Sequence, residues 1–336
     1  MRNYLRRKLL NRYGRSEAEF LINAYSEQLA YGHREVLVKY LNLPKKAYFK
    51  AVLTHGKVLP FELDPISKVL DQFERPILQV LWRSDAEVEA ELNGIQNVLS
   101  IGATGLYALD NIGHRIDKSR QNIENFSNNH TWAKSKKELL SVIGEKKILI
   151  MPYHSWDGDS VKHLSSTFSF LSLTNPANVR VCLGYLDFCN PKIREIYNSY
   201  GWRIECAGVR ASKQFGSPVG GREEFLYQLF DILNWSDIVL GDELNTGMLY
   251  AVCLGKKIGL LPSSAQFEYD YSKWTTTVAA QEIQNKVRLL FPWLIGELIS
   301  PQIIMNDLFS ALGIEKFTHS EKLVTLLPWY IEKSLP

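Results

Sequence analysis

The chain has few cysteines, and no two of them are closely spaced. Four occur in 336 residues, all in the second half, and none has the Cys-x-x-Cys spacing of metal sites and redox motifs. Cys182, Cys206 and Cys253 fall in segments that we expect to be strands or helices, where a free cysteine behaves as a small buried hydrophobe. We therefore expect a reducing, cytoplasmic environment and no metal site.

Long apolar runs and a strong net charge are also missing. The longest apolar run, at about residues 289–295, is short and is interrupted by Pro292, so we expect no membrane span. The first residues lack an apolar stretch followed by a small-residue cleavage site, so we expect no signal peptide. A net charge of +3 is too small to indicate a nucleic-acid partner.

No low-complexity tract and no internal repeat interrupts the chain. Hydrophobic residues make up 46% and charged residues 22%, which is typical of a globular protein. A length of 336 residues is enough for two domains, each with its own core.

The first fifteen residues are basic and have no acid before Glu17. Leucines and a tyrosine between the arginines and lysines would form an apolar stripe on a basic helix, a pattern typical of helices that lie on anionic membrane surfaces. A terminal helix that docks on its own domain has the same pattern. Both interpretations stay open: peripheral contact with the inner face of the plasma membrane, and docking within the protein.

The pattern of the first 130 residues predicts an α/β domain. Strands are expected at 48–54, 76–82 and 97–101, with a helix at 84–94 between the last two. Residues 111–145 are polar and poor in strand signals, so we place the junction between domains there.

A regular alternation of strands and helices begins at Lys146 and predicts a second domain over 146–265. Strands are expected at 147–152, 179–183, 202–207, 237–241 and 258–261, and helices at 160–173, 191–200, 223–234 and from Asn245. This alternation predicts a doubly wound parallel sheet, for which we expect the flavodoxin-like strand order. We expect residues 266–336 to form a helical tail that packs back on the first domain. Its helices are expected at 278–290, 309–312 and 323–327.

Two polar loops of the second domain are expected to meet at one edge of this sheet. In open α/β sheets, ligands bind beyond the carboxyl ends of the strands where the strand order reverses. We expect this switch between the strand ending at Pro152 and the strand ending at Gly241. The loop after the first strand offers His154 and Ser155 as hydrogen-bond donors to a phosphate.

The loop after the second strand leads into a helix at Asn245, Thr246 and Gly247. Free N–H groups and the helix dipole favour an anion at such an N-terminus. An ordinary helix cap and a loop histidine would give the same sequence pattern, and that interpretation also stays open.

Other polar positions are less specific. Asp187 closes a neighbouring strand and is expected either to bond a ribose hydroxyl or a base, or to be a turn residue. Asp157-Gly158-Asp159 matches a metal-binding Asp-x-Asp pattern, but Asp159 is more simply a helix cap. The Gly-Ala-Thr-Gly turn at 102–105 permits close backbone approach, yet it lacks the acidic partner of a dinucleotide fingerprint, which disfavours a nicotinamide oxidoreductase.

The first domain holds candidates for a general base. His55 follows the first expected strand, and Glu62 and Asp64 come shortly after it. These three side chains are of the types that accept a proton from a hydroxyl at neutral pH.

The segment from Ser236 to Lys257 resembles the strand, turn and helix by which bacterial surface-polysaccharide glycosyltransferases of the GT-B fold hold the donor phosphate. Asn245-Thr246 falls where sialyltransferases and polysialyltransferases have a Ser-Ser or Ser-Thr pair. Residues 151–155, Met-Pro-Tyr-His-Ser, are similar to their His-Pro motif. Ser155 stands in place of the proline and Asn245 in place of a serine.

The resemblance implies two Rossmann-like domains and a tail that returns to the first of them. It also implies metal-independent, cofactor-free transfer of a sugar from a nucleotide-sugar donor to a glycan or glycolipid acceptor of a capsule or lipopolysaccharide. The implied donor is a CMP-activated ulosonic or nonulosonic acid, such as sialic acid or Kdo. His154 and Thr246 would hold its phosphate while a base from the first domain activates the acceptor.

Alternatives remain open within and outside this enzyme class. The first is a transferase that uses a UDP-sugar, and the second is a nucleotide-sugar epimerase or hydrolase on the same fold, which would carry several carboxylates at its site. The third is a non-catalytic partner in glycan assembly with a degenerate transferase fold.

Overall fold

The computed structural model describes residues 30–49, 51–53, 78–83, 86–92, 98–130, 136–152, 154, 168–208, 224–242, 244–261 and 299–331. These residues form an α/β protein with two compact units. The first unit holds the described residues up to Ile116, residues 224–226, and those from Phe309 on. The second unit holds Asp117 to Gly208 and Tyr227 to Leu308. Residues 117–130, which the sequence analysis places in the first domain, therefore group with the second unit.

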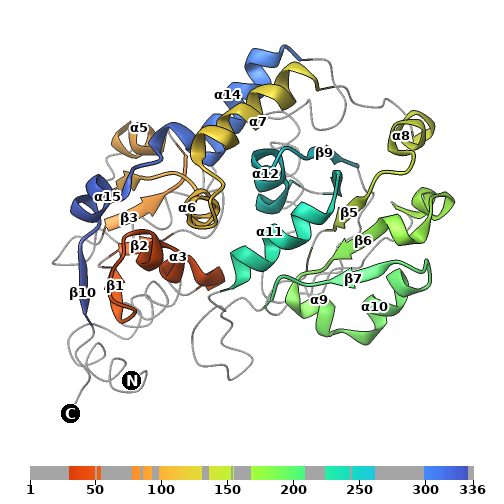
Figure 1. Ribbon diagram of the computed structural model, residues 1–336, viewed down its shortest axis with the longest axis horizontal. Helices are drawn as coiled ribbons and strands as arrows, with labels where there is room; N and C mark the ends of the chain where they lie inside the picture. Colours follow the sequence, from red (N-terminus) through yellow and green to blue (C-terminus); the bar gives the residue numbers. More distant parts are fainter. Residues whose placement is uncertain are drawn as a thin grey trace. The chain divides into compact units, whose positions relative to one another are not determined.

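A five-stranded parallel sheet forms the centre of the second unit (Figure 1). Its strands are β5 (Ile148–Met151), β6 (Val179–Cys182), β7 (Arg203–Glu205), β8 (Ile238–Gly241) and β9 (Lys257–Leu260). All five strands expected from the sequence are confirmed. Strands β5 and β8 are short continuous apolar runs, because a parallel sheet in an α/β fold is covered on both faces.

The order of the strands corrects one expectation. The sheet runs β7-β6-β5-β8-β9, which is 3-2-1-4-5 in order along the chain, so the expected flavodoxin-like order is wrong. The chain adds β6 and then β7 on one side of β5, and α11 (Phe225–Trp235) carries it back to β8 on the other side. The order reverses between β5 and β8, which is the predicted position of the switch.

Helices cover the sheet of the second unit. The core on one face combines sheet residues with α8 (Lys136–Ile143), the 3-10 helix η4 (Ser169–Leu173) and α10 (Pro191–Asn198), and its largest side chain is Trp202. Each fully buried aliphatic side chain of this core contributes about 1.5–3 kcal/mol. A short 3-10 helix, η5 (Pro176–Asn178), precedes β6.

Three further helices complete this unit. They are α7 (Ile116–Asn128), α9 (Tyr185–Cys189) and α12 (Thr246–Cys253). Helix α12 packs beside β8 and β9 (Figure 1). Helix α7 is tied to the end of α12 because the Asn122 side-chain amide donates a hydrogen bond of 2.6 Å to the Cys253 carbonyl.

The first unit contains a smaller parallel sheet of β2 (Ala51–Leu53), β3 (Leu78–Leu81) and β4 (Val98–Ser100). The strands expected at 76–82 and 97–101 are confirmed. The strand expected at 48–54 is divided, because β1 (Ala47–Phe49) pairs antiparallel with β10 (Trp329–Ile331) while β2 pairs with β3.

In the part of the first unit before Ile116, the described helices are η1 (Ala30–Gly32), α3 (His33–Tyr40), α5 (Ala86–Leu92) and α6 (Thr104–Asn111). Helix α3 packs on α6, and the Asn111 side chain donates to the Val36 carbonyl at 3.2 Å.

The C-terminal part contains α14 (Pro301–Leu312), the 3-10 helix η8 (Ile314–Lys316) and α15 (Ser320–Leu326). The helices expected at 309–312 and 323–327 are thus confirmed, while 278–290 lies outside the described residues. Leu312 and Gly313 lie against the carboxyl ends of β3 and β4. The Leu312 carbonyl accepts a hydrogen bond of 2.8 Å from the Ala103 N–H. A Cβ atom at Gly313 would stand 1.6 Å from the Trp82 carbonyl oxygen.

Two cysteines behave as expected from the sequence. Cys182 in β6 and Cys253 in α12 are buried, and burial raises the pKa of each thiol to about 12. Cys206 is half-buried just after β7, and Cys189 is exposed at the end of α9. In the described part of the chain, no helix is both long enough and apolar enough to cross a membrane.

Candidate functional site

The candidate site lies at the carboxyl edge of the second unit's sheet, where β6, β5 and β8 end side by side. It includes the point at which the strand order reverses, between β5 and β8. Each of these strands is followed by polar residues, and the three strand ends bring those residues to one edge.

The N-terminus of α12 is fixed to the end of β5. Asn245 has an extended backbone, and its side-chain oxygen accepts a hydrogen bond of 3.1 Å from the Met248 N–H. Its side-chain nitrogen lies 3.5 Å from the Met151 carbonyl, a long contact across the switch. Because Asn245 satisfies the third N–H of the helix, the N–H groups of Thr246 and Gly247 are the ones at the helix end that have no partner within the helix.

Gly247 allows this close approach. A Cβ atom at this position would stand 2.5 Å from Cε and 3.0 Å from Sδ of Met151. The first turn of α12 therefore rests on the last side chain of β5. Any larger residue at position 247 would push these two elements apart or displace Met151.

His154 lies over the end of β6. A Cβ atom at Gly184 would stand 2.8 Å from Cβ and 3.3 Å from Cγ of the histidine, so the absence of a side chain at Gly184 makes room for the imidazole. The same position would lie 3.7 Å from a carboxylate oxygen of Asp187. His154 is half-buried, whereas Asp187 is 1% exposed.

Two carboxylates near this edge act on a buried phenol. The pKa of the Tyr197 hydroxyl is raised well above its ordinary value, mainly by burial and then by the negative charges of Asp242 and Asp187. Asp242 directly follows β8, and Tyr197 comes from α10. Asp187 and Asp242 are therefore near enough to the phenol to act on the same group from two strand ends.

The residues expected from the sequence fall into two groups. His154, Asp187, Asn245, Thr246 and Gly247 all lie at this edge, beyond the ends of β5, β6 and β8. Ser155, the candidate bases His55, Glu62 and Asp64, and the Asp157-Gly158-Asp159 pattern lie outside the described residues.

Asp242 is not among the site residues expected from the sequence, and the electrostatic link between Tyr197 and the two aspartates is not expected either. Tyr197 occupies an apolar position of α10 and gives no sign of a polar role in the sequence. Asp242 had a usable signal, because it is the first residue after a buried strand.

In the turn at 102–105 of the first unit, the N–H group of Ala103 cannot bind a ligand, because it already has a hydrogen-bond partner. Gly102 has a left-handed backbone with φ of +81°, as a tight turn from strand to helix requires. The Ala103 N–H, at the N-terminus of α6, already donates to the Leu312 carbonyl. That carbonyl takes the position that the oxygen of a bound anion would need.

The polar groups of the candidate site favour a ligand that carries both a negative charge and hydrogen-bond donors. The α12 N-terminus suits an anion, while a buried carboxylate such as Asp187 suits a hydroxyl or an amino group. No group of three or more histidines, cysteines, aspartates or glutamates that could hold a metal ion occurs within the described ranges.

Comparison of the chain with protein-family models, with curated proteins and with solved structures finds no match in any of the three.

Proposed function

We propose that the protein is a glycosyltransferase that transfers a sugar from a nucleotide-sugar to a glycan or glycolipid acceptor. One observation carries this proposal. The N-terminus of α12 is joined to the end of β5 by Asn245 and Gly247, at the switch point of a parallel sheet. A nucleotide phosphate is the ligand that such a helix end suits best.

The neighbouring residues supply roles for the rest of the donor. Asp187 accepts a hydrogen bond from a ribose hydroxyl or from the exocyclic amine of a base. His154 and Thr246 donate to the phosphate as it departs, while Ser155 follows His154 in the same loop. Donors placed in this way stabilise the developing charge of a leaving group, and each is worth about 10²–10³ in rate.

The reaction is a direct displacement in which a base deprotonates the acceptor hydroxyl as the sugar leaves the nucleotide. His55, Glu62 and Asp64 remain the proposed bases. The favoured donor is a CMP-activated ulosonic or nonulosonic acid, because of the resemblance of residues 236–257 to bacterial sialyltransferases and related enzymes. By the same resemblance, the acceptor is a capsule or lipopolysaccharide glycan. The cysteine pattern favours action in the cytoplasm, and the basic N-terminal residues favour contact with the inner membrane face.

The proposed function implies that the two units are Rossmann-like domains. Two Rossmann-like domains with a returning C-terminal tail form the scaffold of GT-B enzymes. The 3-2-1-4-5 order of the second unit supports this assignment, as does the parallel β2-β3-β4 sheet of the first. The contacts of Leu312 and Gly313 with Ala103 and Trp82 support a tail that returns to the first unit.

A thermal-shift screen of the full chain against CMP, UDP, GDP and UMP tests the proposal. A ligand that binds only the folded state stabilises it by about 2.7 kcal/mol when the ligand concentration is a hundred times the Kd, and this raises the melting temperature. We expect CMP to give the largest shift. A shift with UDP alone would indicate a UDP-sugar enzyme, and no shift with any nucleotide would favour a non-catalytic partner.

His154→Ala tests the leaving-group role. We expect turnover of the nucleotide-sugar to fall about a hundredfold, because a donor to the departing phosphate is lost. His114→Ala is the matched control, since His114 is also half-buried but follows α6 in the first unit. Turnover that stays near normal in His154→Ala would remove this residue from the site.

A nucleotide-sugar epimerase is the second candidate, and one observation favours it. The charges of Asp242 and Asp187, two carboxylates near the carboxyl edge, both act on the buried Tyr197 hydroxyl and help to raise its pKa. Acid-base chemistry on a sugar needs such titratable groups. Incubation with UDP-N-acetylglucosamine without acceptor, followed by proton NMR of the sugar, separates the two functions. An epimerase would produce a second sugar isomer, and the proposed transferase would produce none.

A further inference from the structure

A pocket opens in the second unit, away from the candidate site. It has a volume of about 200 Å³ and lies between the C-terminal half of α7 and the turn that joins α12 to β9. Because β9 begins at Lys257, this pocket is at the amino edge of the sheet, whereas the candidate donor site is at the carboxyl edge.

One wall of the pocket is a row of asparagines on α7. Asn122, Asn125 and Asn129 line it at spacings of three and four, which places them on one helix face. Asparagine is a poor residue for a helix interior, because its amide competes for backbone hydrogen bonds. A row of them on one face therefore needs a reason beyond helix formation.

Packing explains the first of these asparagines and leaves the second unexplained. Asn122 is buried and donates to the Cys253 carbonyl, so it holds the wall in place. Asn129 donates to the backbone carbonyl of Asn125 at 2.8 Å. The Asn125 side chain is exposed and makes no hydrogen bond among the described residues. Its amide offers both a donor and an acceptor to a ligand.

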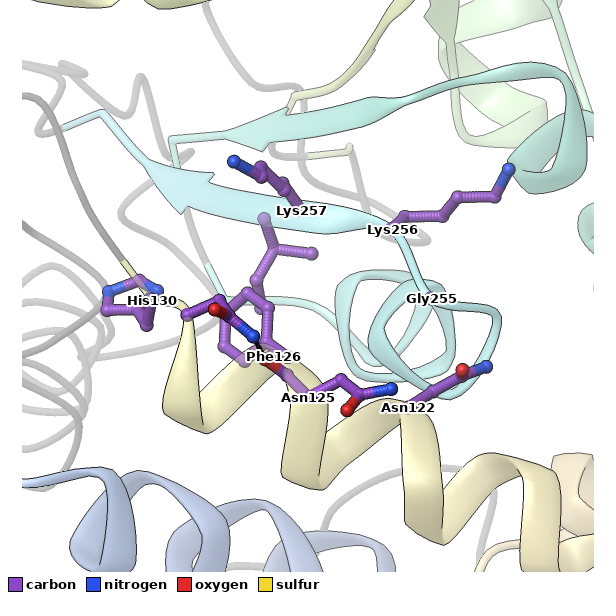
Figure 2. Close-up of a pocket in the computed structure, with 9 residues that line it drawn as sticks. Asn122, Asn125, Phe126, His130, Gly255, Lys256 and Lys257 are labelled. Atoms are coloured by element: carbon purple, nitrogen blue, oxygen red, sulfur yellow. Dashed lines mark hydrogen bonds between the residues drawn. The ribbon is translucent and has the colours of Figure 1, made fainter.

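The ring of Phe126 completes this wall. Phe126 is half-buried, and the centre of its ring lies 4.9 Å from that of His130. Figure 2 shows Asn125, Phe126 and His130 along the α7 side of the pocket, with Lys257 on the β9 side. An apolar ring next to a free amide suits a ligand with both C–H faces and hydroxyls.

The opposite wall is a rigid turn. Gly255 has a left-handed backbone with φ of +77°, and a Cβ atom there would meet the Asn122 side chain at 3.4 Å. The Lys256 N–H donates to the Ala251 carbonyl at 2.9 Å, which closes the end of α12. The Lys256 ammonium donates to the Asn234 carbonyl at 2.9 Å, away from the pocket.

Two helix C-termini at the pocket disfavour a negatively charged ligand. The C-termini of α7 and α12 both border it, and their carbonyl groups carry partial negative charge. His130 and Lys257 follow these helix ends in the chain, a position where basic residues are common. The pocket therefore does not favour a phosphate, although two lysines and a histidine line it.

We propose that this pocket binds a neutral saccharide unit. The Asn125 amide pairs with adjacent sugar hydroxyls, each of which is also a donor and an acceptor, and the Phe126 ring packs against the C–H face of the sugar. The inference does not rest on the proposed transferase activity, because the pocket and the donor site occupy opposite edges of the sheet.

Saturation-transfer NMR on the full chain tests this inference, with glucose, galactose and N-acetylglucosamine as separate probes and inorganic phosphate as a competitor. We expect transfer to at least one sugar, and no competition by phosphate. Asn125→Ala should weaken that binding about five- to tenfold, the effect of one or two lost hydrogen bonds.

Asn128→Ala is the matched control. Asn128 is an exposed asparagine at the end of the same helix, and it does not line the pocket. Equal binding by the Asn125→Ala and Asn128→Ala variants would overturn the inference, as would displacement by phosphate or no transfer to any of the three sugars. The thermal shift with CMP should be the same in both variants, so failure of this inference is distinguishable from failure of the proposed function.

Discussion

Replacement of Gly313 by alanine tests how tightly the C-terminal segment closes the first unit. Gly313 has a left-handed backbone with φ of +56°. Its Cα region lies so close to the end of β3 that a Cβ would stand 1.6 Å from the Trp82 carbonyl oxygen and 2.7 Å from the carbonyl carbon. These are backbone atoms, which cannot rotate away as the end of a side chain can.

The expected cost has three contributions. The left-handed backbone costs a residue with a side chain about 1–2 kcal/mol. Forcing the extra carbon into a packed contact costs about 1–3 kcal/mol. The shift also weakens the hydrogen bond from Ala103 to Leu312, which is worth about 1 kcal/mol. The sum is about 3–6 kcal/mol of unfolding free energy.

Gly113→Ala is the matched control for the backbone contribution. Gly113 is in the same unit and has φ of +86°, but a Cβ there would meet nothing within 4 Å. We expect this variant to lose only about 1–2 kcal/mol. The difference between the two variants isolates the contact with Trp82.

Differential scanning calorimetry measures both variants. At about 3 °C per kcal/mol for a unit of this size, Gly313→Ala should melt about 9–18 °C below the wild type and Gly113→Ala about 3–6 °C below it. Equal melting temperatures for the two variants would refute the placement of Gly313 against the end of β3.

Three further predictions follow from the second unit. Asn245→Asp should keep the cap of α12, since aspartate and asparagine cap helices equally well, but the negative charge should abolish the thermal shift with CMP. Asn245→Ala should lower the free energy of unfolding in urea by about 1 kcal/mol. The free energy of unfolding should be highest below about pH 9 and fall as the pH rises toward 12, because unfolded thiols ionise near 9.0 while burial raises the pKa of Cys182 and Cys253 to about 12. Urea unfolding across this range should show a smaller fall in Cys253→Ala than in the wild type. An equal fall in both proteins would argue against this assignment. Iodoacetamide should modify Cys189 in the native protein and leave Cys182 and Cys253 intact, as peptide mass spectrometry would reveal.

The strands of the second unit could be predicted because their signal is local. Residues 148–151 and 238–241 are short apolar runs bounded by polar residues, as buried parallel strands require. Their order could not be predicted in the same way. The position of β7 depends on which side of β5 the chain turns, and no short-range pattern in residues 183–203 records that choice.

Residues of the candidate site that follow a strand could be predicted from the sequence, whereas a residue that comes from a helix could not. His154 and Asn245 follow β5 and β8, and the switch-point rule places them at one edge. Tyr197 comes from α10 and feels the charges of Asp187 and Asp242, but its spacing is that of an ordinary core residue. The contact between Gly313 and Trp82 joins positions far apart in the chain, so the sequence alone gave no sign of it.

Titration calorimetry with CMP and with cytidine tests the central claim most directly, that the edge between β5 and β8 holds a nucleotide phosphate. The two ligands differ only in the phosphate. We predict that CMP binds the wild type at least about tenfold more tightly, a difference of about 1.4 kcal/mol, and that His154→Ala and Asn245→Asp remove most of this difference. Equal affinity for CMP and cytidine in the wild type, or a difference that both variants retain, would contradict the account.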